Sequence, residues 1–95
     1  MIIHPDAENE LNAAIDYYES CEEGLGISLL YEVEMAFTKI SENPFTWGVF
    51  HKNFHRYLVH RFPFAVIYII ENEQLFIIAI AHTRRKPFYW KSRLG

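Results

Sequence analysis

Cysteine, glycine and long apolar runs are all scarce in this sequence of 95 residues. The single cysteine, Cys21, has no partner within the chain for a disulfide, so no oxidising compartment is implied. The longest apolar stretch, Phe62 to Ile70, is far below the roughly 20 residues that a membrane helix needs, and Pro63 interrupts it. The first residues also lack the apolar region of a secretory signal. We therefore expect a cytoplasmic protein without a membrane segment.

The patterns of several common catalytic and cofactor sites are missing too. One cysteine and scattered histidines do not give the ligand spacing of a zinc site. No glycine-rich phosphate loop and no Gly-x-Ser-x-Gly motif occur. The many carboxylates fall on the expected outer faces of helices, so a glycosidase-like acid pair is not expected. The sequence predicts neither a metal ion nor a cofactor.

The charge that is present divides into two blocks. Residues 1–50 carry one basic and ten acidic residues, a net charge of −9, whereas residues 51–95 carry eight basic and two acidic residues, a net charge of +6. If the two halves form different faces, the molecule is an electric dipole whose basic face attracts phosphate or an acidic protein. The alternative is an acidic, solvated helix surface beside ordinary basic chain ends.

Apolar residues at helical spacing predict two helices, over residues 5–22 and 25–42. Pro5 suits the first position of a helix, and Asp6 and Glu8 lie at the positive end of its dipole. Glycines at 24 and 26 allow the chain to turn, and the residue before Pro44 resists a helical conformation. Two helices with so short a connection are expected to pack as an antiparallel hairpin.

The second half of the chain changes to the pattern of strands. Runs rich in Val, Ile, Tyr and Phe predict strands over residues 54–61, 64–71 and 75–82, and Met1–Ile3 adds a possible short one. Residues 45–53 are predicted to form a loop with aromatic anchors. With 51% hydrophobic residues, the chain is expected to form one domain over residues 1–95. The fold class is α+β, a helical hairpin packed on a mainly antiparallel sheet of three to four strands.

A cluster of basic and aromatic residues follows the last predicted strand. His82 ends that strand, and three cations come directly after it: Arg84, Arg85 and Lys86. Arginines at such a site hold phosphate through paired hydrogen bonds, and aromatic rings stack on bases. The surface predicted to contact a target consists of Arg56, Arg61, Arg84, Arg85, Lys86, Trp90 and Lys91.

Each of these residues also has a structural interpretation. His82 could bond a backbone carbonyl at the strand end, and Tyr89 and Trp90 could anchor the tail by packing. Arg84 and Arg85 could pair with helix carboxylates. The prediction of a binding surface therefore requires these cations to lie together and apart from the acidic helices.

Several stretches together carry a family resemblance. His4–Leu11, Arg61–Tyr68 and the run Ala79–Pro87, which contains His-Thr-Arg-Arg-Lys-Pro, are similar to the first helix, the central hairpin and the final strand of the RelE/ParE superfamily. The resemblance covers nearly the whole chain and implies the element order β-α-α-β-β-β. It also implies a toxin of a type II toxin–antitoxin system, with a cognate antitoxin encoded nearby.

The superfamily divides by target, and the resemblance leaves three functions open. ParE-like members inhibit DNA gyrase by binding, and RelE-like members cut mRNA on the ribosome without a metal. In the second case the catalytic residues would be His82, Arg84, Lys86 and Tyr89. Ala65 stands where RelE-like enzymes usually carry arginine, and the chain is net acidic, so we favour the ParE-like function. The third alternative is an inactive member that only binds the antitoxin.

Overall fold

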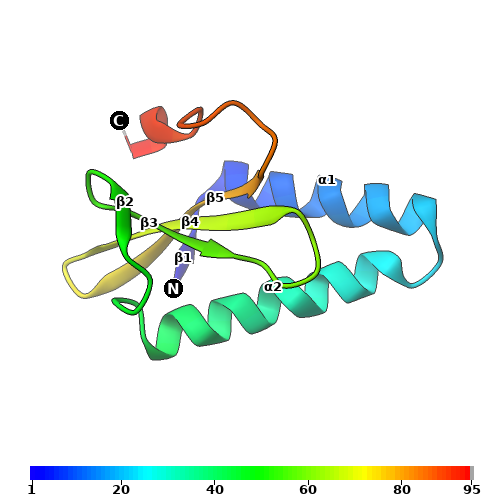
Figure 1. Ribbon diagram of the computed structural model, residues 1–95, viewed down its shortest axis with the longest axis horizontal. Helices are drawn as coiled ribbons and strands as arrows, with labels where there is room; N and C mark the ends of the chain where they lie inside the picture. Colours follow the sequence, from blue (N-terminus) through cyan, green and yellow to red (C-terminus); the bar gives the residue numbers. More distant parts are fainter. Residues whose placement is uncertain (95) are drawn as a thin grey trace.

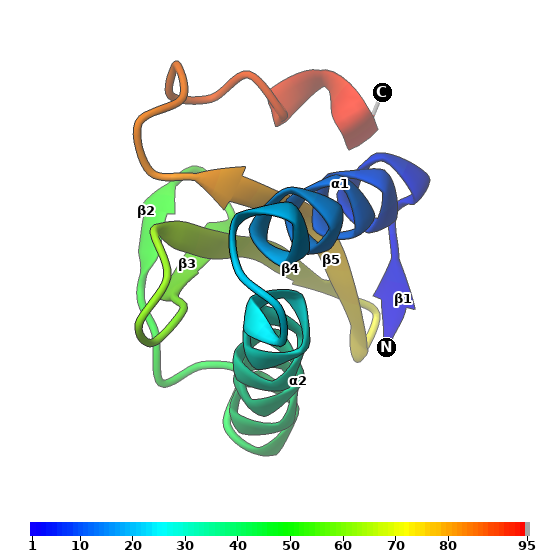
Figure 2. The same ribbon diagram turned by 90° about the vertical axis from the view of Figure 1, so that its right-hand side faces the viewer.

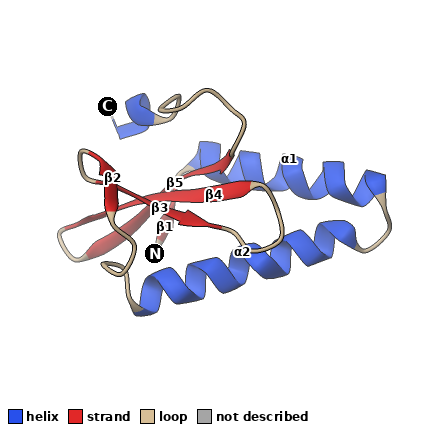
Figure 3. Ribbon diagram, in the orientation of Figure 1, coloured by secondary structure: helices blue, strands red, loops and turns tan. Residues whose placement is uncertain are grey.

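The computed structural model describes residues 1–94 and contains two long helices and a five-stranded sheet (Figures 1 and 3). The elements follow one another as β1 (Ile2–Ile3), α1 (Pro5–Cys21), α2 (Leu25–Glu42), β2 (Val49–His51), β3 (Phe54–Leu58), β4 (Phe64–Glu71), β5 (Gln74–His82) and a short 3₁₀-helix η1 (Lys91–Leu94). The α+β class and the helical hairpin are confirmed.

The turn between the helices is fixed by glycine and by one glutamate. Gly24 has a φ of +87°, in the left-handed region that favours glycine. The Glu19 carboxylate accepts hydrogen bonds from the backbone N–H groups of Gly24 and Gly26, which are free donors at the start of α2. A Cβ on Gly26 would lie 2.7 Å from the carbonyl oxygen of Ile15, so α1 and α2 touch at this point.

The sheet has the strand order β1-β5-β4-β3-β2 and is mixed. β1 runs parallel to β5, and the other pairs are antiparallel. The sheet is larger than predicted because residues 49–51, within the predicted loop, form β2 against β3. β3 ends at Leu58 rather than Arg61, so Arg61 lies in the connection to β4.

Side chains of β4 and β5 fill two separate cores, one on each face of the sheet. The face toward the helices holds Val66, Tyr68 and Ile77, which pack against Leu29 and Val33 of α2 among others. The opposite face is also apolar, and its buried residues are Phe54, Ala65, Ile67, Ile69, Ile78, Ala79, Ala81 and Trp90. Strands that are apolar on both faces need a cover on both.

The second face is covered by the end of the chain. Residues 83–94, the C-terminal strap, leave the end of β5 and run back over the sheet on the side away from α2 (Figures 1 and 2). Phe88, Tyr89 and Trp90 of the strap pack against the second core. A register shift in β5 beside Ile67 and Tyr68 places Ile78 and Ala79 together on this face.

Candidate functional site

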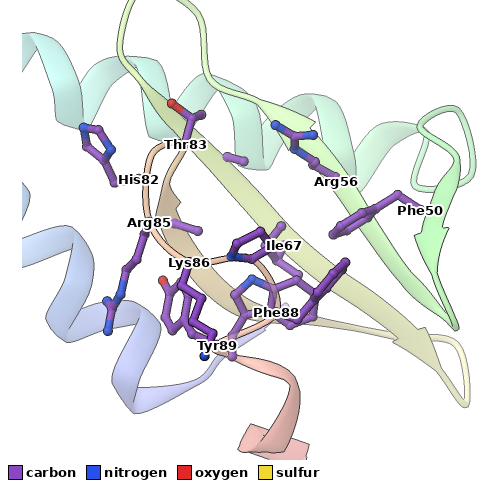
Figure 4. A pocket seen from close by; sticks show the side chains of 13 residues that line it. Phe50, Arg56, Ile67, His82, Thr83, Arg85, Lys86, Phe88 and Tyr89 are labelled. Carbon is purple, nitrogen blue, oxygen red and sulfur yellow. The ribbon is translucent and has the colours of Figure 1, made fainter.

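The strap and the second sheet face enclose a cleft of about 230 Å³ (Figure 4). Its floor consists of small and apolar side chains from β4 and β5, among them Ala65, Ile67 and Ala81. Phe50 of β2 and Phe88 of the strap line it with stacked rings whose centroids lie 6.0 Å apart. No carboxylate is among its lining residues, which include Arg56, Arg85 and Lys86.

Two of the predicted cations, Arg61 and Arg84, lie in segments that adjoin at one end of the sheet, the β3–β4 connection and the start of the strap. Thr83 donates its backbone N–H to the Pro63 carbonyl at 2.9 Å, which joins the start of the strap to the β3–β4 connection that carries Arg61. Arg56 of β3 and Lys86 of the strap line the same cleft. Within residues 1–94, no ion pair is found for the exposed side chains of Arg56, Arg61, Arg84, Lys86 and Lys91.

Arg85 departs from this group. Its side chain extends toward α1 (Figure 4) and lies 3.4 Å from the Glu10 carboxylate, although it remains about half exposed. Its guanidinium also stacks on the Tyr89 ring at 3.7 Å from the centroid. Arg85 therefore pairs with a helix carboxylate, which was the structural interpretation given for it above.

Glu10 is the centre of a hydrogen-bond network that joins α1, β5 and the strap. Its carboxylate accepts two hydrogen bonds of 2.9 Å from the Arg93 guanidinium and one from the Tyr89 hydroxyl. It also accepts the backbone N–H of Ile80, at 3.1 Å. The expectation that the helix carboxylates all point outward is wrong for Glu10, whose side chain is only 14% exposed.

The network alters the acidity of its members. Burial alone raises the pKa of Glu10, but the hydrogen bonds from Arg93, Tyr89 and Ile80 outweigh burial and hold that pKa below its ordinary value. Burial and the hydrogen bond to Glu10 raise the pKa of Tyr89 to about 12. The bond to Glu10 likewise raises the pKa of Arg93. The network is therefore charged at neutral pH, as a carboxylate with two guanidinium groups.

Comparison with known families agrees with this fold. The family model described as ParE toxin of type II toxin–antitoxin system, parDE, matches residues 1–87. The chain belongs to the ParE toxin family. No curated protein matches the chain. Residues 88–94 of the strap, with Trp90 and Arg93, lie beyond the part that the family model matches.

Membership of the ParE family implies an antitoxin partner, because these toxins belong to two-component systems. Within residues 1–94, no helix is long and apolar enough to cross a membrane. The same residues contain no group of three or more His, Cys, Asp or Glu placed to hold a metal ion.

Trp90 and Tyr89, two aromatic residues predicted at the site, contribute to the packing of this ParE-family fold. Trp90 was predicted to contact a target, but it is only 3% exposed, and its ring packs against Phe54 at 4.6 Å between centroids. It is a packing anchor, and its indole face is not available for stacking. Tyr89 is half-buried, with its hydroxyl donated to Glu10.

His82 ends β5 immediately before the strap, and Phe88 lies within the strap. His82 accepts the backbone N–H of Arg84 through its Nδ1 at 3.1 Å, rather than bonding a carbonyl as the structural alternative had it. Phe88 has a φ of +64°, a conformation that costs a bulky residue energy and persists only where its surroundings impose it. The Phe88 ring contacts Phe50 and also His51, at 4.5 Å between ring centroids.

Proposed function

We propose that this ParE-family chain is a cytoplasmic toxin that inhibits DNA gyrase by binding, with no bond broken by the toxin. The proposed contact surface consists of exposed cations of β3, of the β3–β4 connection and of the strap that form no ion pair within residues 1–94: Arg56, Arg61, Arg84 and Lys86. Arg85 takes part with the exposed portion of its side chain, and Lys91 extends the surface along the strap. Such a surface suits the phosphates of gyrase-bound DNA or an acidic protein surface.

The observation that carries the proposal is that Tyr89, which a nuclease would need, is held by Glu10, and that the floor of the cleft is apolar. The Tyr89 hydroxyl is bound to Glu10, and a phenol with a pKa near 12 is a poor proton donor or acceptor at neutral pH. Ala65 and Ala81 line the floor of the cleft, where a nuclease would benefit from a cation against the reacting phosphate. Of the four residues that a nuclease would use, His82 and Lys86 line the cleft, but Tyr89 is bound to Glu10, and the exposed cations favour binding.

The test is supercoiling of relaxed plasmid by purified gyrase with increasing amounts of toxin. We expect supercoiling to fall with toxin concentration and to recover when the cognate antitoxin is added. Normal supercoiling at saturating toxin would refute the proposal. Mapping of mRNA ends on translating ribosomes is the matched assay for the nuclease alternative, and we expect no new ends.

A further inference from the structure

The strap is held on the molecule mainly by side chains. Apart from the bond between Thr83 and Pro63, the backbone hydrogen bonds of residues 83–93 form local turns, such as that from Lys91 to the Phe88 carbonyl. Contacts to other elements come from the Phe88 and Trp90 rings and from the groups bound to Glu10. The conformation of the strap therefore depends on a small number of side-chain anchors.

The exposed cations Arg84 and Lys86 lie between two points at which the strap is attached to the rest of the molecule. The first is the end of β5, where Thr83 joins the β3–β4 connection. The second is the Glu10 network, which holds Tyr89 and Arg93 farther along the strap. Arg93 also donates to the Ile78 carbonyl at 2.9 Å, so the end of the strap is fixed to β5 as well as to α1. Fixing both sides of a short loop restricts the directions in which its side chains project.

We propose that Glu10 is a positioning residue of the toxin, which fastens the strap so that Arg84 and Lys86 meet the target in one orientation. The inference rests on the proposed function and adds to it a residue on α1, outside the contact surface. Glu10 is suited to this role because one carboxylate binds two segments that are far apart in sequence, at Ile80 and at Arg93. Preorganising a binding loop strengthens binding because less conformational entropy is lost on contact.

The variant Glu10→Gln tests the proposal, with Glu8→Gln as its matched control. Glu8 lies on the same helix, is exposed and forms no salt bridge among the described residues. Hydrogen exchange of the isolated toxin is expected to become faster in residues 83–94 of the Glu10 variant and to stay unchanged in β4 and α2. Inhibition of gyrase is expected to weaken by roughly ten- to a hundredfold, since several side chains must then be ordered on binding. The Glu8 variant is expected to match the parent in both measurements.

A double variant separates positioning from a general loss of structure. If Glu10 acts through Arg93, then Arg93→Gln also weakens inhibition, and the combination of both gives a loss smaller than the sum of the two single losses. Additive losses would overturn the proposal. A pH titration of Trp90 fluorescence, in a Trp47→Phe background, provides a second readout. The signal is expected to show a change at acidic pH with Glu10 present that is missing with Gln.

The groups around Glu10 define what this titration reports. They are Arg85, Tyr89 and Arg93 from the strap, Asp6 on α1, and His82, which lines the same surface concavity. Substituting Glu10 removes only its own titration, so any change shared by both proteins belongs to the other groups.

Each remaining outcome also decides the proposal. Unchanged exchange in the strap of the Glu10 variant would overturn the fastening. A freed strap with equal inhibition would overturn positioning. Stronger inhibition would also overturn it and would show that Glu10 masks Arg85 and Arg93. Should the parent toxin leave gyrase active, the proposed function fails by itself. Hydrogen exchange in residues 83–94 then tests whether Glu10 fastens the strap. Growth arrest by the parent and the variants, expressed at matched protein levels, tests whether Glu10 positions it.

Discussion

Glu10 on α1 and Arg93 at the end of the strap are joined by two hydrogen bonds of 2.9 Å, across 83 positions of sequence. Both side chains are largely shielded, with exposures of 14% and 12%. A paired, partly buried arginine–carboxylate contact is stronger and more directional than an exposed ion pair. This contact ties the last described turn of the chain to its first helix.

Substituting Arg93 is therefore expected to reduce stability. Arg93→Gln leaves a shielded carboxylate with fewer donors, and we expect the free energy of unfolding to fall by about 1–3 kcal/mol. Urea denaturation at neutral pH measures the change. Lys91→Gln is the control, because Lys91 is exposed and lies in the same 3₁₀-helix. A loss no larger than that of the control would contradict the role assigned to Arg93.

The same network predicts a pH dependence of stability. The pKa of Glu10 is lowered in the folded state, so its stabilising contribution is present above the unfolded pKa of about 4.3 and is lost as the pH falls through the lower folded value. Eleven other carboxyl side chains titrate in this range, so the difference between the parent and Glu10→Gln is the informative quantity. We expect the difference in unfolding free energy to be constant above about pH 5.5 and to shrink toward pH 3. A difference that is independent of pH would contradict it.

The helices and central strands could be predicted from sequence because their patterns are local. Pro5, the glycines at 24 and 26 and the residue before Pro44 mark the helix ends, and helix α2 occupies residues 25–42 as expected. β2 could not be predicted, because a three-residue edge strand has almost no pattern of its own and forms only where β3 supplies hydrogen bonds.

The candidate site was harder to predict than the fold. Charge counting locates Arg84, Arg85 and Lys86 in the sequence. It does not indicate that Arg85 pairs with Glu10 and Arg84 does not, because the pairing depends on which face of α1 meets the strap. One signal was present for Glu10. It lies three residues after Ala7 and four before Ala14, both buried, so helical spacing places it near the packed face. The position of Trp90 just after a cationic loop suggests exposure. Trp90 is buried because the second face of the sheet is apolar and the strap covers it, which the sequence alone does not indicate.

Gly26 is expected to tolerate no side chain. An added Cβ would come within 2.7 Å of the Ile15 carbonyl oxygen, so Gly26→Ala must separate α1 from α2. Overpacking of this kind lowers stability by about 1–3 kcal/mol, and we expect a matching decrease in the denaturation midpoint. Gly48→Ala is the matched control, because a Cβ there meets nothing within 4 Å. Equal stability of the two variants would contradict the close contact of the helices.

Tyr89→Phe separates the binding and nuclease functions. The substitution removes only the hydroxyl that donates to Glu10 and keeps the ring that packs on the second core. If the toxin acts by binding, growth arrest should persist, with stability lowered by about 1 kcal/mol for the lost hydrogen bond. Loss of growth arrest with the fold intact and with unchanged hydrogen exchange in the strap would instead indicate that the phenol takes part in chemistry.

The last prediction concerns the exposed cations themselves. Arg84 and Lys86 are exposed and form no ion pair within residues 1–94, so replacing both with alanine is expected to change stability by less than about 0.5 kcal/mol. If they contact the target, gyrase inhibition should weaken and its dependence on salt concentration should become less steep, since fewer charges then meet. Lys39→Ala on α2 is the control, because Lys39 is exposed and belongs to the acidic half of the sequence. Equal inhibition by the control and the double variant at every salt concentration would remove these two cations from the contact surface.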